Sequence, residues 1–190
     1  LSSMVFFFEL QDRSRKTIAT LTTDNRIVRN MANRDPLTGL ANRRVFEQAL
    51  DDLVDGEKHG ALLLVDVDDF KKVNDTLGHQ EGDRILRLIA GVLQRCVRTS
   101  DISARIGGDE FALLLPDCDV KTAGRIAERI CSDVMRATKG VGVSVGVSLC
   151  SPPTDRQTFM ASADRELYRA KLAGKGRAFM PPPSPPAIRR

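Results

Sequence analysis

The chain has 190 residues, enough for one domain with a full hydrophobic core and short flanking segments. Its 29 Lys and Arg against 25 Asp and Glu give a net charge of +4, which suits phosphate-bearing partners of several kinds. With no Trp and one Tyr, the chain lacks the aromatic platforms of a single-strand nucleic-acid binder. The four Cys include no CxxC pair, which argues against a zinc site or a disulfide framework and favours a reducing cytoplasm.

Residues 1–33 are predicted to precede the domain as a helical linker. An apolar run at residues 4–8 is too short to cross a membrane and fits the end of an upstream membrane helix or sensor domain. Residues 9–33 contain neither Gly nor Pro, and their apolar side chains recur at spacings typical of a partial heptad. This pattern is compatible with a coiled coil between two copies and equally with a solvated tether. Membrane attachment is expected only through such an upstream segment.

Residues 34–180 are predicted to form one domain of alternating helices and strands. Asp35-Pro36 is expected to open a helix, because Asp caps helices and Pro suits their first turn. Amphipathic periodicity predicts further helices at residues 43–54, 82–96 and 121–137, and helices are also expected at residues 69–77 and 156–172. Short apolar runs predict strands at residues 61–67, 103–106, 111–115 and 141–149. Five prolines between residues 181 and 186 predict that residues 181–190 form a Pro-rich tail.

The glycine pair Gly107-Gly108 stands between two of the predicted strands. It predicts a hairpin with a two-residue primed turn, which requires positive φ angles, and its missing Cβ atoms would let a nucleotide approach the backbone. A hairpin within alternating helices and strands is typical of the α+β class. We therefore expect a sheet that contains antiparallel strands and is flanked by helices.

Acidic side chains follow two of the predicted strands. Asp66, Asp68 and Asp69 end the first strand, and Asp109 and Glu110 follow the glycine pair. If the two strands are neighbours, Asp66 and Asp109 reach the same sheet edge, where two carboxylates repel each other unless a cation lies between them. Mg²⁺ suits such hard oxygen donors. The alternative is an ordinary turn with solvated acids.

Other polar side chains in the sequence suit a nucleotide. Asn74 and Asp83 together can read the edge of guanine, since Asp accepts from its N–H groups and Asn donates to a ring acceptor. Lys171 and Lys175 lie four residues apart and share one helix face. They can bind phosphates or complement the helix dipole, and their spacing alone favours the dipole.

The string RIGGDEF at residues 105–111 resembles the signature of the GGDEF family, the bacterial diguanylate cyclases. The resemblance continues in DPLTGLANRR at residues 35–44 and in the segment from DVDDFK to GD at residues 66–83. It also includes residues 163–171 of the last predicted helix, which finish with the string YRAK. It spans about residues 34–179 in order. It implies a palm-like nucleotidyl-cyclase core of order βαββαβ, with a largely antiparallel central sheet flanked by helices.

The resemblance implies a Mg²⁺-dependent enzyme that condenses two GTP into cyclic di-GMP and releases two pyrophosphates, with Mn²⁺ as an alternative ion. The metal ligands it implies are Asp66, the backbone carbonyl of Val67, and Asp109. Lys71 is implied to stabilise charge in the transition state, and either Asp109 or Glu110 to take the proton. The residues implied in GTP binding are Phe70, Lys71, Asn74, His79, Asp83, Gly107, Gly108, Lys171 and Lys175.

Two further expectations concern regulation and assembly. Because each chain holds one GTP, turnover requires a homodimer, and a coiled-coil linker would raise the effective concentration of its two halves. Arg98 and Asp101 resemble the family's inhibitory product site, in which Arg forks onto guanine and a carboxylate takes its N–H donors. The alternative is a surface Arg–Asp pair of little energetic value. The resemblance also implies a bacterial protein that acts in the cytoplasm.

The rival to an enzyme is a catalytically silent module that senses GTP or cyclic di-GMP for an attached partner. The intact set of implied metal, lysine and guanine-reading residues argues against it. A nucleic-acid binder is disfavoured, because the sequence contains no zinc finger, RNP string or basic helix run.

Overall fold

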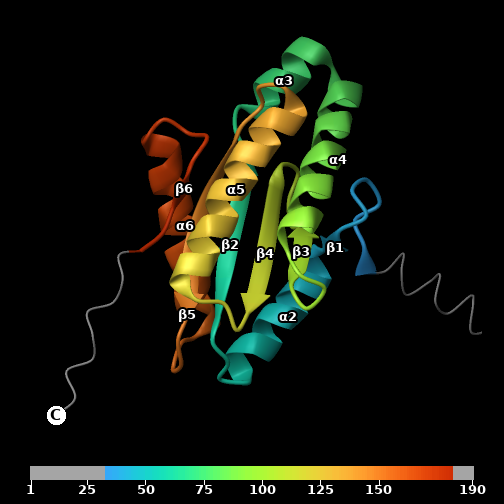
Figure 1. The fold of residues 1–190 in the computed structure, drawn as a ribbon. Coiled ribbons are helices and arrows are strands. Elements are labelled where there is room, and N and C mark those ends of the chain that lie inside the picture. Colours follow the sequence, from blue (N-terminus) through green and yellow to red (C-terminus); the bar gives the residue numbers. More distant parts are fainter. Residues whose placement is uncertain (1–32, 182–190) are drawn as a thin grey trace, which may run out of the picture. The chain divides into compact units, whose positions relative to one another are not determined.

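The computed structural model describes residues 33–181. Apart from Asn33 and Pro181, the predicted linker and Pro-rich tail lie outside these residues. The described elements follow in the order β1-α2-β2-α3-α4-β3-β4-α5-β5-α6-β6 (Figure 1). None of the helices between residues 33 and 181 has the length and apolar character needed to cross a membrane.

A six-stranded sheet with the order β1-β3-β4-β2-β5-β6 forms the centre of the fold. β2 lies between β4 and β5 and is antiparallel to both, and β3 is antiparallel to β4. The short strands β1 and β6 run parallel to β3 and β5 at the two edges. The strands are β1 Ala41–Asn42, β2 Gly60–Val67, β3 Ile102–Arg105, β4 Glu110–Pro116, β5 Val143–Cys150 and β6 Ala178–Phe179. This largely antiparallel sheet between helices confirms the predicted α+β class.

Helices cover both faces of the sheet (Figure 1). On β2, Leu63 and Val65 belong to a core cluster with α4 and α5, whereas Leu62 and Leu64 belong to a second cluster with α2 and α6. Because β2 is buried on both faces, its sequence is a continuous apolar run rather than an alternating one. The helices are α2 Arg43–Asp55, α3 Phe70–Leu77, α4 His79–Cys96, α5 Val120–Thr138 and α6 Arg156–Leu172.

Side-chain caps set the start of three of these helices. Asn42 accepts a hydrogen bond from the Val45 N–H at 3.2 Å at the start of α2. Asp119 and Asp155 accept in the same way from the third residue of α5 and of α6, at 2.7 and 2.9 Å. Each cap satisfies one of the N–H groups that a helix start leaves without an intrahelical partner.

Three local predictions are wrong. Asp35-Pro36 opens a turn rather than a helix, since Asp35 accepts from the Thr38 and Gly39 N–H groups at 2.8 and 2.9 Å and the chain then enters β1. Helix α4 begins at His79, three residues before the predicted start at residue 82. The hairpin loop is longer than a two-residue turn and spans residues 106–109, so its glycines do not adopt positive φ.

Close packing of α6 on β5 depends on a glycine. A Cβ atom at Gly146, in the middle of β5, would collide with the backbone carbonyl of Ala163 and the backbone N–H of Leu167 on α6. Backbone atoms within a helix have little freedom to move aside, so only glycine lets these two elements approach this closely. This contact fixes the position of the helix that ends at Lys171 and Leu172.

We predict that Gly146→Ala lowers the free energy of unfolding by about 1–3 kcal/mol, because the added methyl overpacks the interface between β5 and α6. Urea unfolding followed by circular dichroism measures the change. The control is Gly91→Ala within α4, where an added Cβ would meet only the Arg95 guanidinium at 3.5 Å. That control should raise stability by about 0.5–1 kcal/mol. Equal stability of Gly146→Ala and the parent chain would contradict the packing argument.

Candidate active site

The acidic segments of β2 and β4 meet at one edge of the sheet. The antiparallel register places Asp66 opposite Glu110, and the Val67 N–H donates to the Asp109 carbonyl at 3.2 Å. Partial burial raises the pKa of Asp66, as do the negative charges of Asp109 and Asp68, although Lys171 acts in the opposite direction. The carboxylates are thus close enough to repel one another, which is the condition under which a cation is favoured.

Two lysines from the end of the domain lie against this acidic segment. The Lys171 Nζ, in the last turn of α6, is 2.8 Å from Asp66 Oδ2. The Lys175 Nζ, in the turn after α6, is 2.7 Å from Asp69 Oδ1. That hydrogen bond lowers the pKa of Asp69 and raises the pKa of Lys175. The structure therefore brings both predicted phosphate ligands to the site, each beside a carboxylate.

The connection from β2 to α3 is held by hydrogen bonds from two other parts of the chain. Asp68 accepts from the Ser144 hydroxyl at 2.6 Å and from the Gly176 N–H at 2.9 Å, and its own N–H donates to the Gly142 carbonyl at 3.0 Å. Asp69 then takes a left-handed conformation with a φ of 54° and makes no side-chain cap to α3. No side chain caps the first turn of α3, which carries the predicted phosphate-binding N–H groups of Phe70 and Lys71.

The predicted guanine-reading residues lie on two adjacent helices. Asn74 is on α3 and Asp83 on α4, and the side-chain oxygen of Asn74 lies against the backbone of Gly82, so that a Cβ there would collide with it. His79 is the first residue of α4 and is exposed. The structure thus brings Asn74 beside the residue that precedes Asp83, as a shared guanine site requires.

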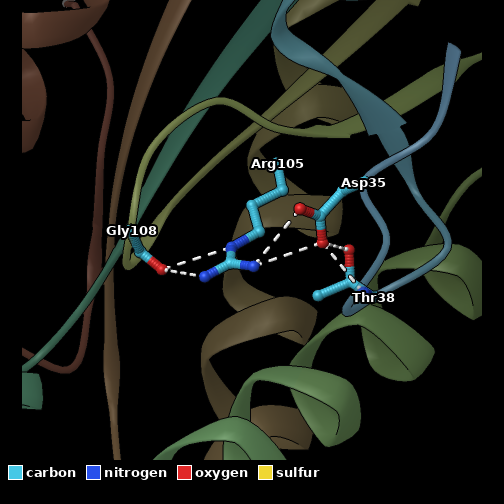
Figure 2. Close-up of polar contacts among 4 residues, drawn as sticks. All are labelled: Asp35, Thr38, Arg105 and Gly108. Atoms are coloured by element: carbon cyan, nitrogen blue, oxygen red, sulfur yellow. Dashed lines mark hydrogen bonds and ion pairs between the residues drawn. The ribbon is translucent and has the colours of Figure 1, made fainter. Parts of the chain in front are cut away.

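Arg105 joins the GGDEF loop to the turn at the start of the domain (Figure 2). Its Nη1 lies 3.2 and 3.3 Å from the two carboxylate oxygens of Asp35, while its Nε and Nη2 donate to the Gly108 carbonyl at 3.2 and 2.7 Å. Asp35 also accepts from the Thr38 N–H and hydroxyl. One guanidinium therefore fixes the backbone just before Asp109. The sequence analysis assigned no role to Arg105, because nothing in the sequence pairs it with a residue 70 positions away.

The Asp35 contact predicts a pH-dependent contribution to stability. Partial burial opposes ionisation of Asp35, but the Thr38 hydrogen bonds and the Arg105 charge outweigh it and lower the pKa below 3.8. A lowered folded-state pKa stabilises the fold above the unfolded pKa, and this stabilisation disappears as the pH falls through the folded value. Asp35→Asn should therefore lower the free energy of unfolding by about 1 kcal/mol at pH 7 and by less at pH 3. Urea unfolding at both pH values tests this, and an equal difference at both would contradict it.

The predicted product-site residues form a tight turn after α4. The Arg98 N–H donates to Asp101 Oδ2 at 2.8 Å, and the Asp101 N–H donates to the Arg98 carbonyl at 3.1 Å. Within residues 33–181 the Arg98 guanidinium makes no ion pair with Asp101, so the two residues contact each other through the Arg98 backbone. Both residues line a small cavity of about 120 Å³ that Cys118 and Asp119 also border.

The sheet edge presents oxygen atoms of the kind that Mg²⁺ prefers as ligands. No group of three or more His, Cys, Asp and Glu side chains is arranged to hold a metal among the described residues. The ligand set predicted from the sequence needs only two carboxylates, Asp66 and Asp109, with the Val67 carbonyl, and Mg²⁺ usually completes such a shell with water and phosphate oxygens. Burial is the main cause of the raised pKa of Asp66, and the negative charges of Asp109 and Asp68 add to it, so a cation beside these carboxylates would be favourable.

Comparison with known proteins shows the family of this chain. The family model described as "Diguanylate cyclase, GGDEF domain" matches residues 32–177, and the chain therefore belongs to the GGDEF family. It is 39% identical over 176 residues to the probable diguanylate cyclase DgcE of Escherichia coli, and 40% identical over 159 residues to the response regulator PleD of Caulobacter vibrioides. These matches cover 84% and 76% of this chain but only 16% and 35% of the two relatives.

Solved structures of diguanylate cyclases have the same fold. The coiled coil and GGDEF domain of DgcB from Caulobacter crescentus, in complex with c-di-GMP, matches with a TM-score of 0.82 at 30% identity, over 88% of this chain and 95% of that one. The diguanylate cyclase SiaD from Pseudomonas aeruginosa, in complex with its activator SiaC, matches with a TM-score of 0.73 at 30% identity, over 95% and 74% of the two chains. The palm-like fold implied by the sequence is therefore confirmed.

Proposed function

We propose that this chain is a diguanylate cyclase domain that condenses two GTP into cyclic di-GMP with release of two pyrophosphates. The observation that carries the proposal is the meeting of Asp66 and the Asp109 backbone at one sheet edge, beside Lys171. Carboxylates that can hold a metal and a cation that can bind phosphate are the groups that phosphoryl transfer uses around a triphosphate. Membership of the GGDEF family supports the same reaction.

The residues then have the following roles. Asp66, Asp109 and the Val67 carbonyl would hold Mg²⁺, with Mn²⁺ as a substitute, and the ion would supply the positive charge that lowers the pKa of the attacking alcohol and offsets phosphate charge. Asn74 and Asp83 orient the guanine, and the N–H groups of Phe70 and Lys71 bind the β- and γ-phosphates. His79, at the start of α4, lies near the same substrate, and Gly107 and Gly108 lie against the nucleotide.

The chemical step is an in-line displacement at the α-phosphorus. The 3′-oxygen of one GTP forms a bond to the α-phosphorus of the other, and the bond to the bridging oxygen breaks with pyrophosphate taking the electron pair. Asp109 or Glu110 accepts the proton of the 3′-hydroxyl. Lys71 offsets negative charge on the pyrophosphate leaving group, and Lys171 and Lys175 bind phosphate oxygens. A second, identical step closes the ring.

Turnover requires two copies of the domain, because each holds one GTP and the attacking and attacked nucleotides must face each other. The similarity to the DgcB structure, which contains a coiled coil as well as a GGDEF domain, supports a dimerising segment before the domain. GTP is a nucleotide of the cytoplasm, so we expect the domain to act on that side of the membrane.

The first test is incubation of the purified chain with GTP and Mg²⁺, followed by chromatography for cyclic di-GMP. The chain should form product, and Asp109→Ala should reduce the rate by about 10²–10⁴-fold, because it removes a metal ligand and a candidate base. Asp52→Ala, which removes an exposed carboxylate from α2, should leave the rate unchanged. Absence of product at high protein concentration, or with an added dimerising fusion, would exclude the cyclase and favour the nucleotide-sensing module.

Product inhibition is tested separately at Arg98. We propose that cyclic di-GMP binds at Arg98 and Asp101, and relatives solved with c-di-GMP support this class of ligand. Arg98→Ala should raise the cyclic di-GMP concentration that halves the initial rate by about 10–100-fold, because it removes a charged hydrogen-bond donor. Arg95→Ala, an exposed position one turn earlier, is the matched control. Identical inhibition curves for Arg98→Ala and the parent chain would refute this site.

A further inference from the structure

Asp69 is placed where a helix cap is expected but does not act as one. Asp at the N-cap ordinarily accepts a hydrogen bond from the first turn, as Asp119 and Asp155 do on α5 and α6. At Asp69 the left-handed backbone, with a φ of 54°, accompanies a side chain that makes no cap bond to α3. The Asp69 side chain is directed elsewhere and leaves the first turn of α3 without a cap from its N-cap residue.

The Asp69 carboxylate instead binds a lysine 106 residues away. Its Oδ1 lies 2.7 Å from the Nζ of Lys175, which also has a left-handed backbone, with a φ of 63°. The adjacent Gly176 N–H donates to Asp68 at 2.9 Å, so the turn after α6 is held by two neighbouring acids. Lys175 is one of the two cations proposed to bind the triphosphate.

The pair formed by Asp69 and Lys175 is the more exposed of the two lysine–carboxylate contacts at the site. The side chains of Lys175 and Asp69 are 42% and 61% exposed, whereas those of Lys171 and Asp66 are 37% and 15% exposed. An ion pair in contact with water contributes little free energy, so either partner can be exchanged at small cost. A triphosphate carries several negative charges and competes for the same ammonium group.

We propose that Asp69 is a placeholder anion, which occupies Lys175 until a substrate phosphate replaces it, and that Asp69 thereby sets the affinity of the domain for the triphosphate. This inference rests on the proposed function, because it takes Lys175 as a phosphate ligand. The exchange is local, since Asp69 immediately precedes the uncapped first turn of α3. The phosphate gains Lys175, and the carboxylate returns to water.

The test is calorimetric binding of 3′-deoxy-GTP with Mg²⁺, since this analogue lacks the hydroxyl that attacks and forms no cyclic product. Asp69→Asn should bind it about two- to fivefold more tightly than the parent chain, because the competing charge is gone. Lys175→Ala should bind more weakly, and Asp69→Asn should give no gain in the Lys175→Ala background. Asp75→Asn removes the same charge from an exposed position on α3, and this control should leave the affinity unchanged.

These binding measurements test the role of Asp69 without any need for cyclic di-GMP formation. Unchanged or weaker binding by Asp69→Asn overturns the inference. If Asp69 merely positioned Lys175 for the triphosphate, its removal would not strengthen binding. An equal gain in affinity in the Lys175→Ala background also overturns the inference. The gain would then come from the loss of a negative charge near the site and not from the release of Lys175. Failure of the parent chain to bind the analogue also overturns the inference, because no triphosphate would then replace Asp69 at Lys175. Coupled binding without cyclic di-GMP formation from GTP would sustain the inference and refute the cyclase.

Discussion

The antiparallel pairing of β2 with β4 is the constraint on which the rest of the site depends. Side chains along β2 alternate between two core clusters, so the strand cannot slip by one residue without moving every buried side chain to the wrong face. Because burial fixes this register, it also fixes the point at which the strand pair reaches solvent. Asp66 and Glu110 are paired there, at the end of an otherwise apolar ladder. The chemistry of the site is thus positioned by the hydrophobic core.

Two different kinds of support then complete the site around this edge. Lys171 is carried by α6, which packs closely on β5 at Gly146, so its ammonium group approaches Asp66 from a fixed helix. Lys175 belongs to a turn that is held by polar contacts with Asp68 and Asp69. The two cations therefore differ in how firmly they are held, although they lie close together in sequence.

Much of this arrangement could be predicted from the sequence, and the failures have physical causes. Helix α6 was predicted at its observed bounds, Arg156–Leu172. The strands β1 and β6 were missed, since two residues are too few to show a period. The glycine pair was taken for a primed turn, although the loop uses two more residues and neither glycine needs a positive φ.

For the site, the sequence predicted that Asp66 and Asp109 reach one sheet edge if their strands are neighbours, but it did not predict the partners of the lysines. The meeting of Asp66 and Asp109 followed from two neighbouring strands. The partners of Lys171 and Lys175 did not, because contacts across about a hundred residues leave no local pattern. The same holds for Asp35 and Arg105, whose motifs were recognised separately.

The Arg105 hydrogen bonds connect the first turn of the domain to the loop that carries Asp109. Residue 35 stands at the beginning of the folded domain, and the Arg105 guanidinium connects it to the Gly108 carbonyl, next to Asp109 (Figure 2). A shift of the domain's first turn would thus act on the backbone next to Asp109 directly, without first deforming the buried sheet.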